Sequence, residues 1–209
     1  MRNKTVCDPR PVFFDSIADK WDTWHDLTDL ARELDTCLAQ FGLKENEVVL
    51  DVGCGTGNLT VALLRRLGPV GRVMAIDISD QMLARAKGKV NDARVTWRHA
   101  SADRLPVDNE GIDRILCFSV WPHFEDHNAV ITEFYRVLRP DGLLHIWHLI
   151  SRDKVNRIHQ EADPSVHHDQ LAPVGKTASL LKKNRFSMIS MADDKTHYSI
   201  TARKEELSS

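Results

Sequence analysis

The sequence predicts an α/β fold, in which a mostly parallel sheet of seven strands is flanked by helices. Three observations support this prediction. Short apolar runs rich in Val, Ile and Leu alternate with segments of helical periodicity, the order expected of parallel strands joined by crossover helices. A glycine-rich turn joins the first of these runs to a helical segment. The chain closes with two apolar runs, 186–191 and 198–203, which favour a hairpin.

The size and composition of the chain narrow the class of protein. A chain of 209 residues with 42% hydrophobic and 28% charged residues is long enough for one domain with a sizeable core. The net charge of −2 gives no reason to expect a nucleic-acid partner. No apolar run is long enough to span a bilayer, and no signal peptide follows the first residues, so no membrane partner is expected. The four cysteines show no paired spacing, which favours a reducing, cytoplasmic location.

The elements follow from apolar periodicity and turn residues. The expected strands before the closing pair cover residues 48–52, 72–77, 94–98, 112–118 and 143–149. Apolar residues near a period of 3.6 predict helices over residues 12–41, 59–67, 82–90, 129–138 and 178–184. Ser79 is a good N-cap for the third of these helices. Residues 1–11 contain two prolines and read as a mobile arm.

The first strand, its turn and the helix after it form a nucleotide-type site. Asp51 ends the strand, and three glycines follow with the spacing G-x-G-x-G. A dinucleotide fingerprint has the spacing G-x-G-x-x-G. A carboxylate at the mouth of the loop repels a pyrophosphate and attracts a cation. A ligand with a nucleoside at one end and an ammonium and a sulfonium at the other therefore fits better than NAD. Asp77, which ends the second strand, is placed to bind both ribose hydroxyls.

These residues resemble the motifs of the class I S-adenosylmethionine (SAM)-dependent methyltransferases. Residues 14–22, F-D-S-I-A-D-K-W-D, resemble the opening F-D-x-I-A-x-x-Y-D of the ubiquinone/menaquinone-type small-molecule branch. The resemblance covers residues 13–139 by motif and reaches residue 204 by the order of elements. It implies a three-layer, Rossmann-like, seven-stranded sheet in a single SAM-dependent methyltransferase domain over residues 1–209. It also implies an N-terminal helical lid at 1–41 and an insert at 150–173 over the acceptor site.

The resemblance implies a cofactor site around the glycine turn. Trp21 stands where the family has a Tyr in its lid, although core packing explains Trp21 and Trp24 nearly as well. The family commonly has an Asp for the adenine amino group where this chain has Ser101, which makes adenine recognition less secure. The implied SAM-binding residues are Trp21, Asp51, Gly53, Cys54, Gly55, Gly57, Asp77, Ile78, Met82, Ser101, Ala102, Asp103 and Phe118.

Histidines around the expected acceptor side allow three interpretations. His148, at the end of a strand, and His123 can act as catalytic bases on the acceptor. Alternatively, His148, His159 and His168 can gather around a divalent metal, although their spacing matches no metal motif. In the third interpretation they are surface or hydrogen-bonding residues of the insert. His145 and His148 are expected on opposite faces of their strand.

The function implied by the resemblance is methyl transfer from SAM to a small-molecule acceptor, giving S-adenosylhomocysteine. The residues expected to contact the acceptor are Trp24, His25, Trp121, His159 and His168. Two other functions stay open on the same fold. One is methylation of RNA or of a protein side chain, and the other is non-catalytic binding of SAM or of a metal by the His-rich insert. We expect a monomer or a homodimer.

Overall fold

The computed structural model describes residues 8–206 and contains a seven-stranded sheet with the order β3-β2-β1-β4-β5-β7-β6. β7 runs antiparallel to both of its neighbours, and the other pairs are parallel. The strands are β1 (Val48–Val52), β2 (Arg72–Asp77), β3 (Val95–His99), β4 (Ile112–Phe118), β5 (Leu138–His148), β6 (Phe186–Asp193) and β7 (Tyr198–Lys204). The predicted fold class and the closing hairpin are confirmed.

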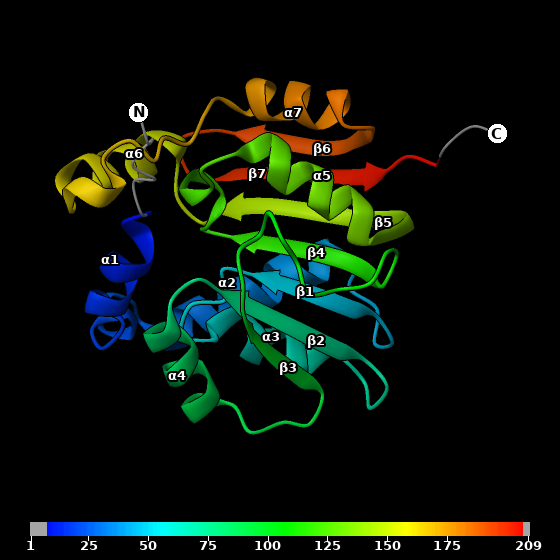
Figure 1. The fold of residues 1–209 in the computed structure, drawn as a ribbon, viewed down its shortest axis with the longest axis horizontal. Coiled ribbons are helices and arrows are strands. Elements are labelled where there is room, and N and C mark those ends of the chain that lie inside the picture. The colour runs from blue at the N-terminus through cyan, green and yellow to red at the C-terminus, as the bar shows by residue number, and fades with distance from the viewer. Residues whose placement is uncertain (1–7, 207–209) are drawn as a thin grey trace, which may run out of the picture.

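Helices cover both faces of the sheet, so the architecture has three layers (Figure 1). The helices are α1 (Arg10–Ile17), α2 (Leu27–Gln40), α3 (Asn58–Arg66), α4 (Asp80–Lys89), α5 (His127–Val137), α6 (Arg152–Glu161) and α7 (Val174–Lys183), with 3₁₀ turns η1 (Trp21–Trp24), η2 (Trp121–His123) and η3 (Pro164–Val166). Apolar side chains of α2, α3 and α4 pack on one face of the central strands, and those of α5, α6 and α7 pack on the other. As expected, the Ser79 hydroxyl caps α4 by accepting from the Met82 amide.

The N-terminal region, expected to be helical over residues 12–41, is divided into separate helical pieces. It consists of α1, η1 and α2, and the chain is extended at His25 and Asp26. The Asp26 carboxylate accepts from the amides of Thr28 and Asp29, so a new helix begins there. The continuous apolar pattern concealed this cap. The expected arm lies partly outside the described residues, and its last two residues belong to α1.

The fifth strand also begins earlier than predicted. β5 pairs with β4 at Leu138, and the two strands pair again from Leu143 onwards with a shifted register. The residues between them, which include the expected turn, form an irregularity within the strand. Arg139 in this segment donates to the Asp113 carboxylate at 2.5 Å, which ties the irregularity to the start of β4. β5 ends at His148, one residue before the predicted end at residue 149.

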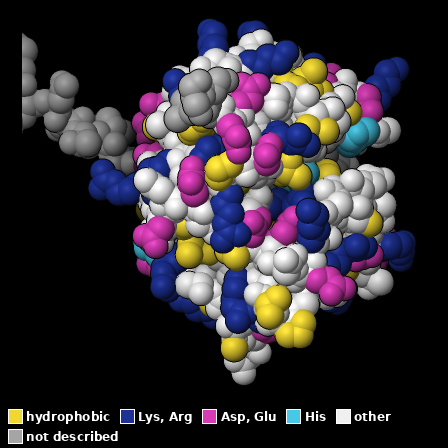
Figure 2. Space-filling model, turned by 90° about the vertical axis from the view of Figure 1, so that its right-hand side faces the viewer, with side chains coloured by type: hydrophobic (Ala, Val, Ile, Leu, Met, Phe, Trp, Pro, Cys, Tyr) yellow, Lys and Arg dark blue, Asp and Glu magenta, His cyan; other side chains and the backbone are white. Residues whose placement is uncertain are grey.

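Charged side chains of both signs are interspersed on the face at which the parallel strands begin (Figure 2). The opposite edge, where those strands end, carries α1, η1 and α6 (Figure 1). Within residues 8–206, no helix has both the length and the apolar character needed to cross a bilayer.

Candidate active site

A cavity of about 670 Å³ lies where the parallel strands end. Its wall combines the glycine turn after β1, the ends of β2 and β4, and residues of α1, η1 and α2. Most of the residues expected to bind SAM line it, namely Trp21, Asp51, Gly53, Cys54, Gly55, Asp77, Ile78, Met82, Ser101, Ala102, Asp103 and Phe118. Among the expected acceptor and catalytic residues, Trp24, His25 and His123 also line it.

The glycine turn has a backbone that other residues adopt only with strain. Gly53 has φ +65°, and a Cβ built on it would lie 2.3 Å from Cγ2 of Val120. Gly57 has φ +84° and is the N-cap residue of α3, where a Cβ would lie 3.2 Å from Cβ of Ala86. Gly57 therefore packs against α4 and is not among the cavity-lining residues. The turn brings its bare backbone to the cavity because glycine has no Cβ there.

Asp51 supplies a buried carboxylate to the cavity wall. The residue is 1% exposed, and one of its oxygens accepts from the Thr60 hydroxyl at 2.6 Å. Burial raises the pKa of Asp51 to about 7, the nearby Asp77 carboxylate adds to this rise, and the Thr60 hydrogen bond opposes it. A cation bound beside this carboxylate would favour its ionised form. The site is therefore suited to a positively charged group.

Asp77 is held by the backbone on both sides. One carboxylate oxygen accepts from the Gly55 amide at 2.8 Å and the other from the Ser79 amide at 2.9 Å. Burial raises the pKa of Asp77, although these amide hydrogen bonds act in the opposite direction. Because each carboxylate oxygen has more than one acceptor site, a pair of hydroxyls can still bind there.

Hydrogen bonds hold the segment around η1 against the glycine turn and the start of α3. The Asp22 carboxylate accepts from the Thr56 hydroxyl at 2.6 Å and from the Asn58 amide at 3.0 Å. Lys89 of α4 donates to the other Asp22 oxygen at 2.8 Å. The indole Nε1 of Trp21 lies 3.8 Å from the position that a Cβ on Gly55 would take. An aromatic face and a second set of polar groups therefore cover the turn.

The features of this cavity fit SAM. Its volume falls within the ~300–1,000 Å³ of typical small-ligand sites. The backbone of the glycine turn, the Asp51 and Asp77 carboxylates and the apolar side chains of Ile78 and Met82 all line it.

His123 lines the cavity, and its imidazole is hydrogen-bonded to a buried carboxylate. Its Nδ1–H donates to the Asp169 carboxylate at 2.7 Å. Arg10 donates to the same carboxylate from Nη2 at 2.8 Å and from Nε at 3.0 Å. Because the carboxylate fixes the proton on Nδ1, Nε2 is left to accept a proton. Sequence reasoning did not assign Asp169 or Arg10 to this role, since no local motif relates residues so distant in the chain.

His148 lies in the interior and is not among the cavity-lining residues. Burial lowers its pKa to about 3, and the neighbouring His123 and His159 add to the effect. Its Nε2 is buried without a hydrogen-bond partner among the described residues. As predicted, His145 lies on the other face of β5, where it stacks on Phe41.

The remaining expected acceptor residues also lie away from the cavity wall. Trp121 is 2% exposed and packs against Phe124 and His127 in the core. His168 is exposed. His159 is buried, and its Nδ1–H donates to the backbone carbonyl of Asp169.

The metal considered at His148, His159 and His168 has no ligand set there. Within the described part of the chain, no group of three or more His, Cys, Asp or Glu side chains is arranged to hold a metal ion. Two of these histidines, His148 and His159, are buried, whereas His168 is exposed to solvent, so the three side chains do not share one environment.

Comparison with known proteins gives consistent results. Residues 49–142 match the family model described as a methyltransferase domain. The chain is 33% identical over 138 residues to a demethylmenaquinone methyltransferase of Lactiplantibacillus plantarum, over 63% of this chain and 58% of that protein. It is 31% identical over 153 residues to a ubiquinone/menaquinone biosynthesis C-methyltransferase of Psychromonas ingrahamii, over 69% of this chain and 60% of that one. The chain thus spans about three fifths of the length of these curated relatives.

Solved structures share the fold. A SAM-dependent methyltransferase from Aquifex aeolicus superposes with a TM-score of 0.73, covering 89% of this chain and 97% of that chain at 22% identity. The chain is thus similar over residues 49–142 to a methyltransferase domain, over about two thirds of its length to quinone-type methyltransferases, and in its fold to a SAM-dependent methyltransferase.

Proposed function

We propose that this protein transfers the methyl group of SAM to a small-molecule acceptor, with release of S-adenosylhomocysteine. One observation carries the proposal. One cavity, at the ends of the parallel strands, is lined by the Asp51 and Asp77 carboxylates and by a glycine turn. The backbone of this turn leaves no room for a Cβ at Gly53. Open α/β sheets bind their ligands at this edge.

Each part of the cavity has a role in the proposal. The Asp51 carboxylate and the Gly53 and Gly55 backbone bind the amino-acid end of SAM. Asp77 binds the ribose hydroxyls, and Ile78 and Met82 pack on the base. Ser101, Ala102 and Asp103 also line the cavity and offer polar atoms to the base. Trp21 covers the glycine turn from the side of η1.

The reaction needs an aligned nucleophile and, where the acceptor is protonated, a base. When bound, SAM supplies a methyl group whose bond to sulfur breaks with the electron pair leaving on sulfur. His123 takes a hydroxyl proton of the acceptor on Nε2, and the electron pair of the resulting oxyanion, directly or through the conjugated ring, forms the new bond to the methyl carbon. His148 has no part in this scheme because it does not line the cavity.

Aromatic side chains on one wall of the cavity are suited to binding a flat or apolar acceptor. Phe14, Trp21 and Trp24 line the cavity from the N-terminal region. The Trp21 and Trp24 rings lie 5.5 Å apart, and Trp24 is 54% exposed although it lines the cavity. The names of the two curated relatives refer to quinones, whose rings are flat and largely apolar. A reduced naphthoquinone is therefore the first acceptor to test.

Isotope transfer tests the proposal. Purified protein is incubated with methyl-labelled SAM and a reduced naphthoquinone, and S-adenosylhomocysteine and labelled product are measured together. Asp77→Asn serves as the binding-defective variant, and Gly88→Ala on the outer part of α4 serves as a folded control. Acceptor-dependent S-adenosylhomocysteine supports the proposal. Tight SAM binding without turnover on a panel of small acceptors would instead favour a non-catalytic binding protein.

We further propose that the protein works in the cytoplasm. Cys37, Cys54 and Cys117 are all free, and two of them are buried beside the glycine turn or within the sheet. Free thiols suit a reducing compartment. Fractionation of cells that produce the protein, with detection by antibody, tests this assignment.

A further inference from the structure

Helix α1 connects two parts of the molecule that border the cavity. It contacts α4 on one side and η3 of the insert on the other, and Figure 1 shows it between α4 and α6 at the edge where the strands end. Toward α4, the Asp15 carboxylate accepts from the Ser79 hydroxyl at 2.6 Å and from the Gln81 amide at 3.0 Å. Toward the insert, Arg10 binds Asp169. The helix is therefore held at both ends by polar contacts.

The contact between Arg10 and Asp169 is well shielded from water. The two side chains are 14% and 3% exposed. The same Asp169 carboxylate also accepts from His123 at 2.7 Å. One carboxylate on the insert thus joins a cation from α1 to the imidazole in the cavity wall. Neither Arg10 nor Asp169 lines the cavity, so neither can act through direct contact with a ligand there.

The chemical consequence concerns the state of His123. An ionised carboxylate at Nδ1 selects one tautomer of a neutral imidazole and fixes the plane of the ring. Burial of Asp169 opposes its ionisation, but the hydrogen bonds from His123 and Arg10 outweigh this effect and leave the pKa of Asp169 below its usual value. The hydrogen bonds from His123 and Arg10 together therefore favour the ionised form of Asp169 that holds His123.

We infer that Asp169 and Arg10 are positioning residues for His123, so that the base is assembled only when α1 is docked against the insert. The inference rests on the proposed function, because it treats His123 as the base. In this inference, docking of α1 against the insert also orients the His123 imidazole on the acceptor side of the cavity.

The groups that face Asp169 come from several elements. They are Arg10 of α1 with Asp8 before it, His123 of η2, His127 of α5 and His159 of α6. Arg10 is the permanent cation among them. Loss of Arg10 should therefore let Asp169 take up a proton more readily, and the acid limb of the rate profile should move to higher pH.

The first experiment needs no acceptor. Protein labelled with ¹⁵N in its histidines is studied by NMR, and the His123 signals are assigned by their loss in His123→Gln. We expect the wild-type ring to carry its proton on Nδ1 and to show slow exchange of that proton. Asp169→Asn, whose amide can donate or accept, should give a mixture of tautomers. Arg10→Gln should reduce hydrogen-exchange protection of the α1 amides several-fold.

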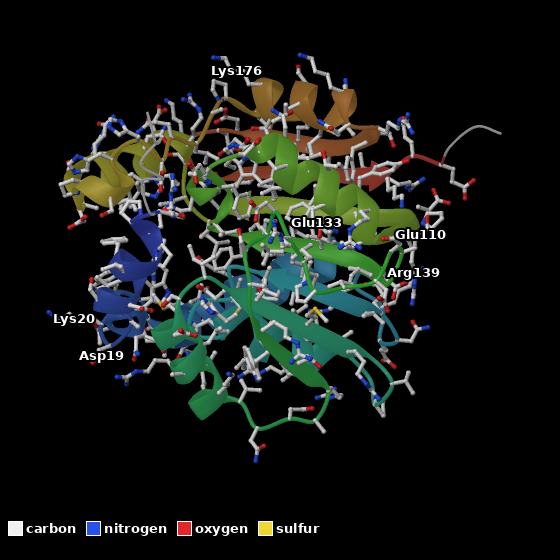
Figure 3. The ribbon with its side chains drawn as sticks, in the orientation of Figure 1. Asp19, Lys20, Glu110, Glu133, Arg139 and Lys176 are labelled. Atoms are coloured by element: carbon white, nitrogen blue, oxygen red, sulfur yellow. The ribbon has the colours of Figure 1, made fainter. Side chains whose placement is uncertain are left out.

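The matched control is Lys20→Gln. Lys20 lies just beyond α1 and points outward beside Asp19 (Figure 3), and it is exposed. This variant should leave the His123 tautomer and the α1 protection unchanged. An unchanged tautomer in Asp169→Asn would overturn the inference, as would equal effects of Lys20→Gln and Arg10→Gln.

The second experiment measures turnover with SAM and the reduced naphthoquinone. Removal of a well-placed base typically costs ~10²–10⁴-fold in rate. We expect Asp169→Asn to lower kcat by ~10²-fold or more with the KM for SAM unchanged. Arg10→Gln, a milder change, should move the acid limb to higher pH. A wild-type protein that turns over while the Asp169→Asn variant keeps its kcat would refute the inference and leave the proposed function standing. A wild-type protein that does not bind SAM would refute the proposed function, and the NMR experiment would still decide the tautomer.

Discussion

Replacement of Gly53 by Ala tests the geometry of the cofactor turn most directly. At φ +65°, an L-residue pays ~1–2 kcal/mol in local strain. The new Cβ would lie 2.3 Å from Cγ2 and 2.8 Å from Cβ of Val120, and overpacking of this kind typically costs ~1–3 kcal/mol. We therefore expect Gly53→Ala to lower the free energy of unfolding by ~2–5 kcal/mol.

Urea unfolding of Gly53→Ala, Val120→Ala, their double variant and a control, each compared with the wild type, separates the two contributions. In the double variant Gly53→Ala/Val120→Ala, the closest overlap is removed while the backbone strain stays. The pair should therefore show a favourable coupling energy of ~1 kcal/mol or more. Gly88→Ala is the matched control, because its Cβ would meet nothing within 4 Å inside α4. It should be neutral or stabilising by ~0.5–1 kcal/mol. A cost for Gly53→Ala within ~0.5 kcal/mol of zero, or no coupling to Val120, would refute the reasoning.

Three further predictions concern charge. Because the pKa of Asp51 is raised to about 7 by burial, calorimetry should find SAM affinity rising as the pH passes upward through about 7, and Asp51→Asn should flatten this rise. Asp77→Asn should weaken SAM binding by ~1–3 kcal/mol, because a ribose hydroxyl loses its charged acceptor, and unchanged affinity would exclude Asp77 from the ribose site. The pKa of His148 is lowered by burial to about 3, whereas an unfolded His titrates near ~6.5. Its contribution to stability is therefore complete above that pH and decreases by up to ~1.4 kcal/mol per pH unit as the pH falls toward 3. Urea unfolding of His148→Leu should show a shallower loss, and an identical slope would contradict this account.

The sequence predicts those parts of the fold that depend on residues close to one another along the chain. The apolar run before Asp51 predicts β1, and the glycines after it predict the turn, because both depend on side chains within a few positions. The N-cap of α4 at Ser79 is equally local. The break within the helical N-terminal region was not located because its apolar spacing continues across Asp26, whose capping role is visible only in its hydrogen bonds.

Histidine placement shows the limit of such reasoning. Strand alternation correctly separates His145 from His148. It cannot tell whether the end of β5 opens into a cavity or is covered, and here α6 and Tyr198 cover it. His123 reaches the cavity wall because η2 turns immediately after β4. The partners that hold it, Arg10 and Asp169, are 159 residues apart and carry no shared local signal.

The two halves of the candidate site differ in how far apart in the sequence their residues lie. The proposed cofactor half is built from the turn after β1 and the end of β2, which lie within the methyltransferase domain match at residues 49–142. Arg10 and Asp169 lie outside that match, one on each side, although His123 lies inside it. The match to the methyltransferase domain therefore bears on the proposed cofactor half more than on the proposed activation of the acceptor. The surroundings of His123 belong to the N-terminal helix and the insert of this chain, so acceptor chemistry is best sought by varying those two segments.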